Sequence, residues 1–380
     1  MTSIDEVHAG YLPLLDSAVL VVAARFGFAE QHGIDLQIHR ERSWAAIRDR
    51  MSVGHFDCAQ MPAPMPIAMS LSHGPLTVQT FAPLVLNTGG NAVTLGNDLA
   101  AAVEDEAPVD ASPAAMGAAL RFAIHRLMER DGRAMRFAVV HRFSCHNYDL
   151  RYWLAASGVH PDKDVEFTVV PPSLLPEALA SGQIDGFSAG EPWNTIAVRA
   201  GAGEIAATKA EIAPLSPEKV LGVSKSMIGD RLEVLERLIA SLLEAASWCD
   251  DPKNHGELSR LLADPRHIAV DSAHLLPGLS GELEIERGSG RTVPNFLKFR
   301  RADGNWPHHS YSEWIYRQML RWGHTAETPE ARAIVQDVYR PDIYAIATNG
   351  AIGGGPLEPV SGTSDPYGLF DDGRSDVSSN

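Results

Sequence analysis

Two segments of the chain combine polar side chains with the sequence signals of a helix start. In the first, Ser144, Cys145 and His146 precede a helix-forming run. In the second, Gly190 and Glu191 follow an apolar stretch. Helix starts present free backbone N–H groups and the positive end of the helix dipole, and both attract anions. The two segments therefore predict a binding site for a small anion.

Four positions are candidates for contacts with such an anion, and each has a structural alternative. His146 can donate a hydrogen bond to an oxyanion, or it can simply cap its helix. The backbone amides of Gly190 and Glu191 can face the anion, or they can serve only to start a helix. Lys219 can neutralise the anion's charge or be an ordinary surface lysine. Trp44 can donate from its indole, cover a planar ligand or lie in the core.

Sequence motifs of common enzyme classes do not occur in the chain. It lacks the phosphate-binding GxxxxGK[ST] and GxGxxG loops, the GxSxG nucleophile turn and the zinc-binding HExxH motif. The adjacent His308 and His309 have no further ligand at a metal-site spacing. We therefore expect no catalytic activity, no cofactor and no metal.

The length and composition are those of a soluble protein with two lobes or domains. The 380 residues are 45% hydrophobic and 21% charged, and 32 basic against 48 acidic residues give a net charge of −16. An acidic surface disfavours direct binding to nucleic acid or to an anionic membrane. A small anion would therefore need a locally positive cleft.

Cysteine usage and the N-terminus both predict a cytoplasmic protein. The three cysteines, Cys58, Cys145 and Cys249, form no recognisable disulfide or metal-binding pattern. No Lys or Arg precedes Arg25, so the basic start of a secretory signal is missing. The apolar run at 18–24 is too short to span a bilayer. The alternative is an exported protein from which a signal has been removed.

The first part of the chain alternates helix and strand signals. Asp16 is expected to cap a helix that runs to about His32, and Ser43 to cap a helix that begins at Trp44. Strands are expected in three places, at 34–39, 56–59 and 76–81. This alternation predicts a mostly parallel sheet covered by helices.

A second lobe is expected to follow a flexible turn at 87–91, which is rich in small residues and would carry the crossover. Helix and strand signals alternate within that lobe, at 112–130, 137–141, 147–157, 165–170, 173–181, 184–189 and 191–200. A strand then returns to the first lobe, and helices follow it, at 219–224, 230–249, 257–262 and 329–339. The predicted boundaries are 1–86 plus 214–347 for the first lobe, 87–213 for the second, and 348–380 for a disordered tail.

Together these segments resemble the nitrate/nitrite-binding and bicarbonate-binding proteins of the NrtA and CmpA type, and most closely the NasS-type cytoplasmic nitrate sensors. The most specific pieces are Gly190-Glu191-Pro192-Trp193-Asn194 and the helix Arg151-Tyr152-Trp153-Leu154-Ala155. The other matching pieces are Ser43-Trp44 with Arg48-Asp49, Gln60-Met61-Pro62 with Pro64-Met65, Leu86-Asn87-Thr88 with Gly90-Asn91, His146, Gly158, Pro171-Pro172, Gly186-Phe187 and Lys219-Val220-Leu221-Gly222. The resemblance covers roughly residues 8–345.

The resemblance implies an α/β fold of the periplasmic-binding-protein type II, with two lobes and a ligand cleft between them. The anion contacts that it implies are Trp44, Asn87, Thr88, Gly89, His146, Gly190, Glu191 and Lys219. Some transport-type members carry an amide side chain where Gly89 stands, so backbone or water would replace one donor here. The bicarbonate-binding branch is expected to use a calcium ion, and Glu191 has no clear partner carboxylates for one. A planar monovalent oxyanion therefore fits better.

Three functions are compatible with the resemblance and the residues. The first is a cytoplasmic nitrate/nitrite sensor that holds a NasT-like RNA-binding antiterminator without ligand and releases it when the anion binds, which regulates nitrate-assimilation genes. The second is the substrate-binding protein of an ABC transporter for nitrate, nitrite, cyanate or bicarbonate. The third is an enzyme related to thiamine-pyrimidine synthesis, for which we recognise no reactive constellation. We expect the sensor, with no direct contact to nucleic acid and no membrane insertion.

Overall fold

The computed structural model describes residues 4–73, 76, 78–108, 111–214, 216–300 and 305–348. These residues form two compact units. Unit 1 contains the described residues of 4–88, 217–272 and 298–348, and unit 2 contains those of 89–216 and 273–297. Each unit has its own sheet with helices packed against it, as expected for an α/β protein. Of the predicted disordered tail only Thr348 is described, and 349–380 lie outside the described residues.

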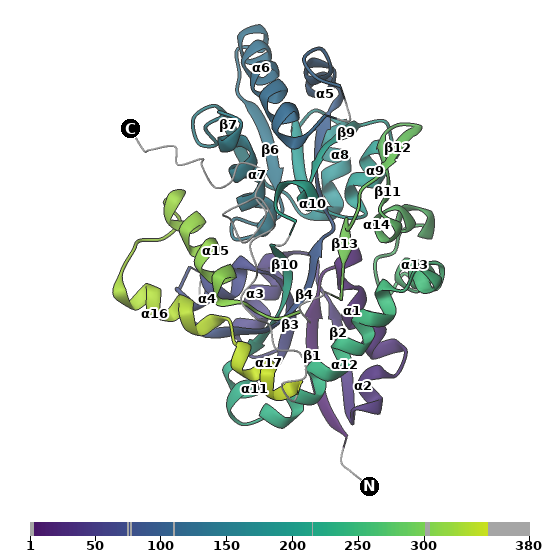
Figure 1. Ribbon diagram of the computed structural model, residues 1–380, viewed down its shortest axis with the longest axis vertical. Coiled ribbons are helices and arrows are strands. Elements are labelled where there is room, and N and C mark those ends of the chain that lie inside the picture. Colours follow the sequence, from purple (N-terminus) through teal and green to yellow (C-terminus); the bar gives the residue numbers. More distant parts are fainter. Residues whose placement is uncertain are drawn as a thin grey trace. The chain divides into compact units, whose positions relative to one another are not determined.

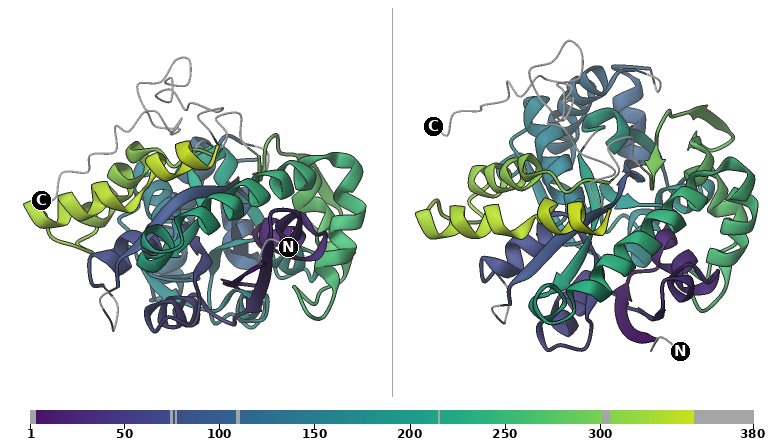
Figure 2. Two further views of the ribbon diagram at one scale, coloured as in Figure 1. Left: turned by 90° about the horizontal axis from the view of Figure 1, so that it is seen from below. Right: turned by 60° about the horizontal axis from the view of Figure 1, so that its bottom comes forward.

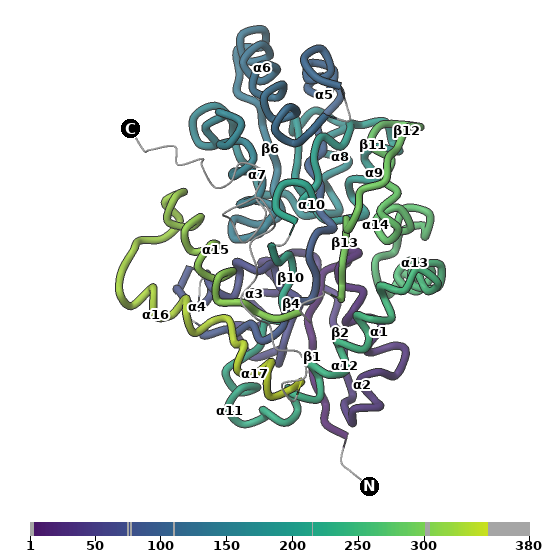
Figure 3. The backbone as a smooth tube through the Cα atoms, in the orientation of Figure 1, coloured from purple at the N-terminus to yellow at the C-terminus, as the bar shows by residue number. Residues whose placement is uncertain are grey.

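Among its described residues, unit 1 contains a six-stranded mixed sheet. Its strands, from one edge to the other, are β13 (Leu297–Lys298), β4 (Thr80–Gly89), β10 (Pro217–Ser224), β3 (Cys58–Pro62), β1 (Asp5–Tyr11) and β2 (Ile34–Arg40) (Figure 1). β1 is parallel to β2 and β3, whereas β10 is antiparallel to both of its neighbours, β3 and β4. Figure 3 shows β10 beside β4, although the two are far apart in the sequence. The expectation of a mostly parallel sheet is confirmed for β1, β2, β3 and β4, which run in one direction, whereas the returning strand β10 enters in the opposite direction and makes the sheet mixed.

Amphipathic helices pack on the unit 1 sheet and on one another. α1 (Ala18–Arg25) lies against α12 (Leu232–Asp250) (Figure 2), and in α12 the buried residues Leu235, Leu238 and Leu242 recur every three or four positions. The other helices described in this unit are α2 (Phe28–Gln31), α3 (Trp44–Ser52), α4 (Pro64–Ser70), α11 (Lys225–Gly229), α13 (His255–Ala263), α15 (His309–Arg321), α16 (Pro329–Val338) and α17 (Pro341–Ala347). None of the helices in the described part of the chain has the length and apolarity needed to cross a membrane.

Asp16 does not cap the first helix as the sequence suggested. It lies in a short 3-10 turn, Leu15–Ser17, and its buried carboxylate contacts Lys219 and Gln60 instead. The expected long helix is also interrupted, because Gly27 adopts a φ of 79°, which a right-handed helix does not allow. α1 and α2 are therefore separate helices, joined at this glycine.

The described residues of unit 2 contain a five-stranded mixed sheet. The strand order is β7 (Val165–Val169), β6 (Met135–Val139), β8 (Gly186–Gly190), β5 (Asn91–Gly96) and β9 (Gly203–Thr208). β6 is parallel to β7 and β8, whereas β5 is antiparallel to β8 and β9. The helices described here are α5 (Asn97–Glu104), α6 (Pro113–Asp131), α7 (Cys145–Ala156), α8 (Leu175–Ala180), α9 (Trp193–Arg199), α10 (Lys209–Ile212) and α14 (Leu276–Ser280). The helices and strands predicted for this lobe are confirmed to within a few residues, but β5, α5, β9 and α10 were not predicted.

The segment 87–91 is not the flexible turn that its small residues suggested. β4 runs through Gly89 and β5 begins at Asn91, so only Gly90 separates two buried strands. Gly89 and Gly90 have φ values of 68° and 83°, and the Gly90 N–H donates to the carbonyl of Phe296 at 2.6 Å. Positive φ values favour glycine, so these two residues set the direction of an ordered chain.

The segment 273–297 belongs to unit 2, whereas the sequence assigned it to the first lobe. It contains a hairpin of β11 (Glu282–Glu286) and β12 (Ser289–Thr292), and β11 contacts β9 and α9. An ion pair of 2.8 Å between Arg199 and Glu284 joins α9 to β11. The hairpin is a local structure, and its attachment to unit 2 depends on long-range contacts that sequence periodicity does not reveal.

Gly203 on β9 is a position where the unit 2 sheet leaves no room for a side chain. A Cβ atom there would collide with the carbonyl oxygen of Leu95 on the neighbouring β5, which is backbone and has little freedom to move. Gly203→Ala should lower the free energy of unfolding by about 1–3 kcal/mol, measured by urea denaturation. Gly229→Ala is the control, since a Cβ at that residue meets nothing within 4 Å. An equal loss in both variants would contradict the steric explanation.

Candidate functional site

Unit 1 contains a buried group of one lysine and two carboxylates, which we call the lysine triad (Asp16, Glu218 and Lys219). The Nζ atom of Lys219 lies 2.7 Å from Oδ2 of Asp16 and 2.6 Å from Oε1 of Glu218. The three side chains are at most 3% exposed. The short charge-assisted contacts hold the ammonium group between two anions.

Strands from distant parts of the sequence position the triad. Lys219 on β10 pairs with Pro62 of β3 on one side and with Asn87 of β4 on the other. Asp16 follows β1, and Gln60 on β3 donates to its Oδ1 atom at 2.5 Å. The triad therefore forms only when β10 is inserted between β3 and β4.

The charges of the triad limit what it can offer to an anion. Burial lowers the pKa of Lys219, but the nearby carboxylates of Asp16 and Glu218 outweigh that effect and hold the pKa at about 12. Burial raises the pKa of Asp16, and Lys219 opposes that rise. Two carboxyl groups contact the one ammonium group, so the charge of Lys219 is already countered by neighbouring residues. Its predicted contact with the anion stays a prediction.

Trp44 and Asn87 lie close to the triad. Trp44 is the first residue of α3, and Ser43 caps this helix as predicted, by accepting a backbone hydrogen bond at 3.2 Å. The Trp44 ring is buried, its centroid is 5.4 Å from Nζ of Lys219, and its Nε1 atom has no hydrogen-bond partner among the described residues. Unit 1 thus brings together three of the predicted contacts, and the fourth, Thr88, follows Asn87 on β4.

In unit 2, the ends of β5 and β8 bring a second group of predicted residues together. Asn91, the first residue of β5, pairs with Gly190, the last residue of β8, and the Glu191 N–H donates to the Gly90 carbonyl at 2.9 Å. The expectation that Gly190 and Glu191 open a helix with free amides is therefore wrong. Strand pairing continues through Gly190 and uses the Glu191 amide, and α9 begins only at Trp193.

The carboxyl group of Glu191 is buried with part of its hydrogen-bonding capacity unused. Its Oε2 atom accepts the Thr195 N–H at 3.1 Å, whereas its Oε1 atom has no hydrogen-bond partner among the described residues. Burial, which leaves the residue 1% exposed, raises the pKa of Glu191 to about 7, and the Thr195 N–H opposes this rise. The group therefore titrates near neutral pH, well above the ordinary value of 4.5.

Further buried groups without partners lie on the same two segments, and we call this set the unit 2 polar cluster (Asn91, Glu191 and Trp193). Both amide atoms of Asn91 and the Nε1 atom of Trp193 have no hydrogen-bond partner in the described part of the chain. The three residues are at most 8% exposed. An unsatisfied buried polar group costs about 1–3 kcal/mol, so a concentration of such groups is typical of a ligand site.

His146 lies beyond the same edge of the unit 2 sheet. It is the second residue of α7, is fully buried, and follows the helix cap Ser144. α7 follows β6 and packs on β8, and the parallel strands β6 and β8 end at one edge of the sheet. His146 comes after the end of β6 and Glu191 comes after the end of β8, so both lie at that edge of the sheet. The predicted contact Gly89 is next to Gly90, and the Gly90 carbonyl accepts the Glu191 N–H.

Four residues of the two clusters were not singled out as contacts from the sequence. Asn91 and Trp193 appeared only within matching motifs, Asp16 was interpreted as a helix cap, and Glu218 was not considered. The sequence did contain a signal for Asn91. Its amide side chain directly follows Gly89 and Gly90 at the predicted crossover between the lobes. No local signal indicated Asp16, because its partner Lys219 is remote in the sequence.

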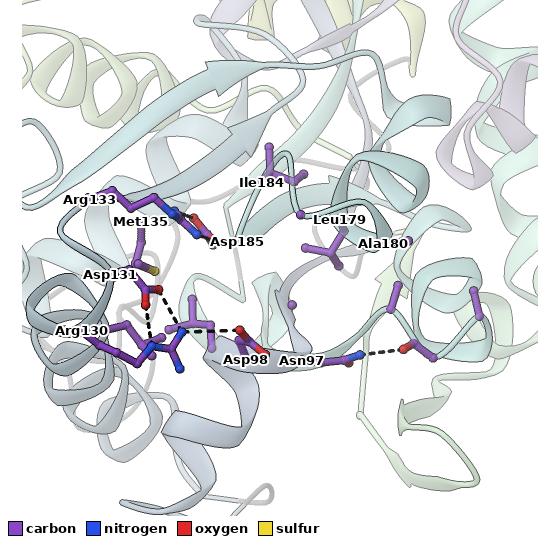
Figure 4. A pocket seen from close by; sticks show the side chains of 17 residues that line it. Asn97, Asp98, Arg130, Asp131, Arg133, Met135, Leu179, Ala180, Ile184 and Asp185 are labelled. Atoms are coloured by element: carbon purple, nitrogen blue, oxygen red, sulfur yellow. Dashed lines mark hydrogen bonds and ion pairs between the residues drawn. The ribbon is translucent and has the colours of Figure 1, made fainter.

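A separate cavity of about 490 Å³ opens in unit 2 at the other end of β5 (Figure 4). The two arginines that line it are bound to carboxylates. Arg133 makes two contacts of 2.7 Å with Asp185, and Arg130 contacts Asp131 at 2.6 Å and Asp98 at 3.5 Å. The cavity therefore offers no excess positive charge to an anion, and none of the predicted contacts lines it.

Removing the charge of Lys219 should leave two buried carboxylates without a counter-charge. We expect Lys219→Met to lower the free energy of unfolding by about 3–5 kcal/mol, the usual cost of breaking a buried ion pair. Lys225→Met, at an exposed position of α11, is the control and should change stability little. Urea denaturation near neutral pH measures both effects.

Adding Asp16→Asn to Lys219→Met should recover part of the loss, because the double variant buries only one unpaired carboxylate. A double variant no more stable than Lys219→Met would contradict the triad as a coupled unit. The pH dependence of the parent provides a second check. The folded-state pKa of about 12 lies above the ordinary 10.5, so the stabilisation is complete below pH 10.5 and is lost as the pH rises toward 12.

The chain has relatives among proteins of known family. A sequence model described as the NMT1-like family matches residues 3–263. The chain is 34% identical over 353 residues to the nitrate import ATP-binding protein NrtC of Synechocystis sp., which covers 90% of this chain and 50% of that protein. It is 28% identical over 379 residues to the nitrate/nitrite binding protein NrtA of Nostoc sp., with coverages of 97% and 82%. The chain thus spans half the length of NrtC and most of that of NrtA.

The fold has a counterpart among solved structures. The periplasmic nitrate-binding protein NrtA from Synechocystis PCC 6803 superimposes with a TM-score of 0.83 at 24% identity, over 97% of this chain and 94% of that one. This similarity confirms the predicted two-lobed α/β fold of the periplasmic-binding-protein type. Because the family model also matches well over half of the sequence, the chain belongs to the NMT1-like family.

Proposed function

We propose that this protein binds nitrate or nitrite and acts as a cytoplasmic sensor of the anion. The observation that carries the proposal is the unit 2 polar cluster, whose buried polar groups have no partner among the described residues. These groups occur in a chain that is similar to the nitrate/nitrite binding protein NrtA. Ligand binding, rather than catalysis, is the activity that such an arrangement supports.

The chemistry of the available groups suits a planar oxyanion that has no hydrogen of its own. Nitrate and nitrite accept hydrogen bonds, and the Asn91 amide and the Trp193 indole are donors with unused capacity. Neutral donors in buried surroundings interact strongly with a charge, because little water screens them. Several of them are needed, since nitrate is a weak acceptor and binds modestly.

The sensor role extends anion binding to regulation. We propose that the ligand-free protein holds a NasT-like RNA-binding antiterminator and releases it when nitrate binds. The net charge of −16 favours a basic partner of this kind and disfavours RNA itself. The effect on the partner is limited by the difference in anion affinity between the free and the partner-bound protein. A typical coupling would weaken the complex about 5–150-fold.

A second candidate is the substrate-binding protein of an ABC transporter for nitrate, nitrite, cyanate or bicarbonate. The similarity to NrtC and NrtA, whose names state nitrate import and nitrate/nitrite binding, supports this role. Anion binding would be common to both candidates. They differ in the partner, which is an antiterminator in the first and a transporter in the second.

Isothermal titration of the anion-free protein with nitrate, nitrite, chloride, and bicarbonate plus calcium tests the binding proposal. We expect saturable heat for nitrate or nitrite only. Asn91→Ala should raise the Kd about tenfold or more, because a hydrogen bond to a charged group contributes about 1.5–3 kcal/mol. Asn97→Ala is the matched control, since Asn97 is exposed on α5 and donates to the Gly201 carbonyl in the separate cavity.

Two outcomes of this titration would contradict the proposal. Silence toward both nitrate and nitrite would remove the proposed ligand and leave a member of the family that binds another molecule. A loss of affinity in Asn97→Ala as large as that in Asn91→Ala would show that the unit 2 polar cluster is not where the anion binds.

Size-exclusion chromatography with a purified NasT-like antiterminator tests the sensor role. We expect the two proteins to elute as one complex without anion and to separate when nitrate exceeds its Kd, because the anion then favours the released state. Chloride at the same ionic strength should leave the complex intact. If the proteins never elute together although nitrate binds, the sensor role is wrong and the transporter role remains.

A further inference from the structure

Glu191 is an unexpected neighbour for an anion that only accepts hydrogen bonds. An ionised carboxyl group also only accepts, and it repels a second negative charge in buried surroundings. The Oε2 atom of Glu191 is already bound by the Thr195 N–H, so Oε1 is the oxygen available to a ligand. Oε1 can contact nitrate favourably only if it carries a proton.

We propose that Glu191 binds the anion as a neutral carboxylic acid with its proton on Oε1, so that anion binding takes up one proton. This inference rests on the proposed function, because it assigns the role of Glu191 in the same site. The balance is direct: protein with ionised Glu191, one anion and one proton give a complex in which the Oε1–H donates to the anion. The buried surroundings then gain no net charge, which avoids the cost of a second buried anion.

The surroundings of Glu191 make this protonation accessible near neutral pH. The residue is 1% exposed, and burial raises its pKa to about 7, against the opposing effects of Thr195 and Asn194. A bound anion raises the pKa further, since like charge disfavours the ionised form. Proton uptake and anion binding thus favour each other.

Other ionisable groups around β8 are held differently. Arg199 on α9 lowers the pKa of Glu191 slightly and is itself bound to Glu284 at 2.8 Å. β5 carries no ionisable side chain. The remaining elements packed on β8 are α7, β6 and α8. Their ionisable residues are Cys145, His146, Tyr148, Asp149, Arg151 and Tyr152 on α7, Arg136 on β6 and the exposed Glu177 on α8. Asp149 is bound to Lys209, and Arg151 is bound to Asp162. A histidine can also take up a proton in this pH range, so His146 is the residue whose contribution an experiment must separate from that of Glu191.

Titration calorimetry of the full chain with nitrate in two buffers of different ionisation heat, phosphate and Tris, counts the protons. At about pH 8 we expect uptake of close to one proton per anion, with an apparent Kd that rises about tenfold per pH unit above that and is flat below about pH 6. Glu191→Gln keeps a donor in place of the acid. It should bind nitrate with neither proton uptake nor pH dependence over the same range.

Glu177→Gln is the matched control, because this exposed residue of α8 should leave the proton uptake of the parent unchanged. Nitrate binding without proton uptake in the parent would overturn the inference and leave the proposed function standing. So would proton uptake that persists in Glu191→Gln, since it would belong to another group such as His146. Absence of nitrate binding at every pH would overturn the proposed function and this inference with it. The proton count of the parent is decisive even if the variant fails to fold.

Discussion

The burial of Lys219 between Asp16 and Glu218 is the interaction on which the first unit depends. An ammonium group removed from water needs counter-charges at short range, and both carboxylates lie within 2.7 Å of it. Asp16 follows the first strand of the chain, whereas Lys219 lies on β10, which returns after most of unit 2 and enters the middle of the sheet. The same pairing places Asn87 opposite Lys219 and brings Trp44 within reach of its charge. The ionic contact between Asp16 and Lys219 therefore joins the returning strand β10 to the segment after β1, beside the candidate ligand contacts Trp44 and Asn87.

The unit 2 polar cluster differs from the lysine triad. In the triad the buried ammonium group contacts two carboxyl groups, whereas the unit 2 polar cluster keeps an amide, an indole N–H and a carboxyl oxygen without partners among the described residues. Such groups lower the stability of the free protein. A ligand that satisfies them binds the folded state only and stabilises it by mass action. The free energy that these groups cost in the free protein is recovered when a ligand forms hydrogen bonds with them. Unsatisfied polar groups therefore indicate a ligand site more directly than the presence of a cavity does. In the 490 Å³ cavity, by contrast, the two lining arginines, Arg130 and Arg133, are already bound to carboxylates.

Local signals in the sequence were interpreted correctly where one physical cause dominates. Ser43 caps α3, as predicted, because its hydroxyl satisfies a backbone N–H that the helix leaves open. The interpretations were wrong where two causes share one signal. Asp16 is of a residue type that often caps helices, but it is a buried counter-ion of Lys219. The glycines before Asn91 suggested a flexible turn, but they provide positive φ values between two ordered strands. Gly190 and Glu191 precede a helix in the sequence, yet Gly190 pairs with Asn91 in the sheet and the Glu191 N–H donates to the Gly90 carbonyl.

The sequence by itself determined the α/β alternation, most of the helices and strands, and the resemblance from which the fold and a set of candidate contacts follow. These properties depend on residue types at short spacing, which the chain displays directly. Only the tertiary structure decided which candidates have partners: Lys219 is neutralised by two carboxylates, the Glu191 amide is used by Gly90, and Asn91 and one oxygen of Glu191 remain available. Hydrogen-bond partners and burial depend on residues that are remote in the sequence, so the balance of charge and desolvation at each group exists only after the strands have been placed side by side.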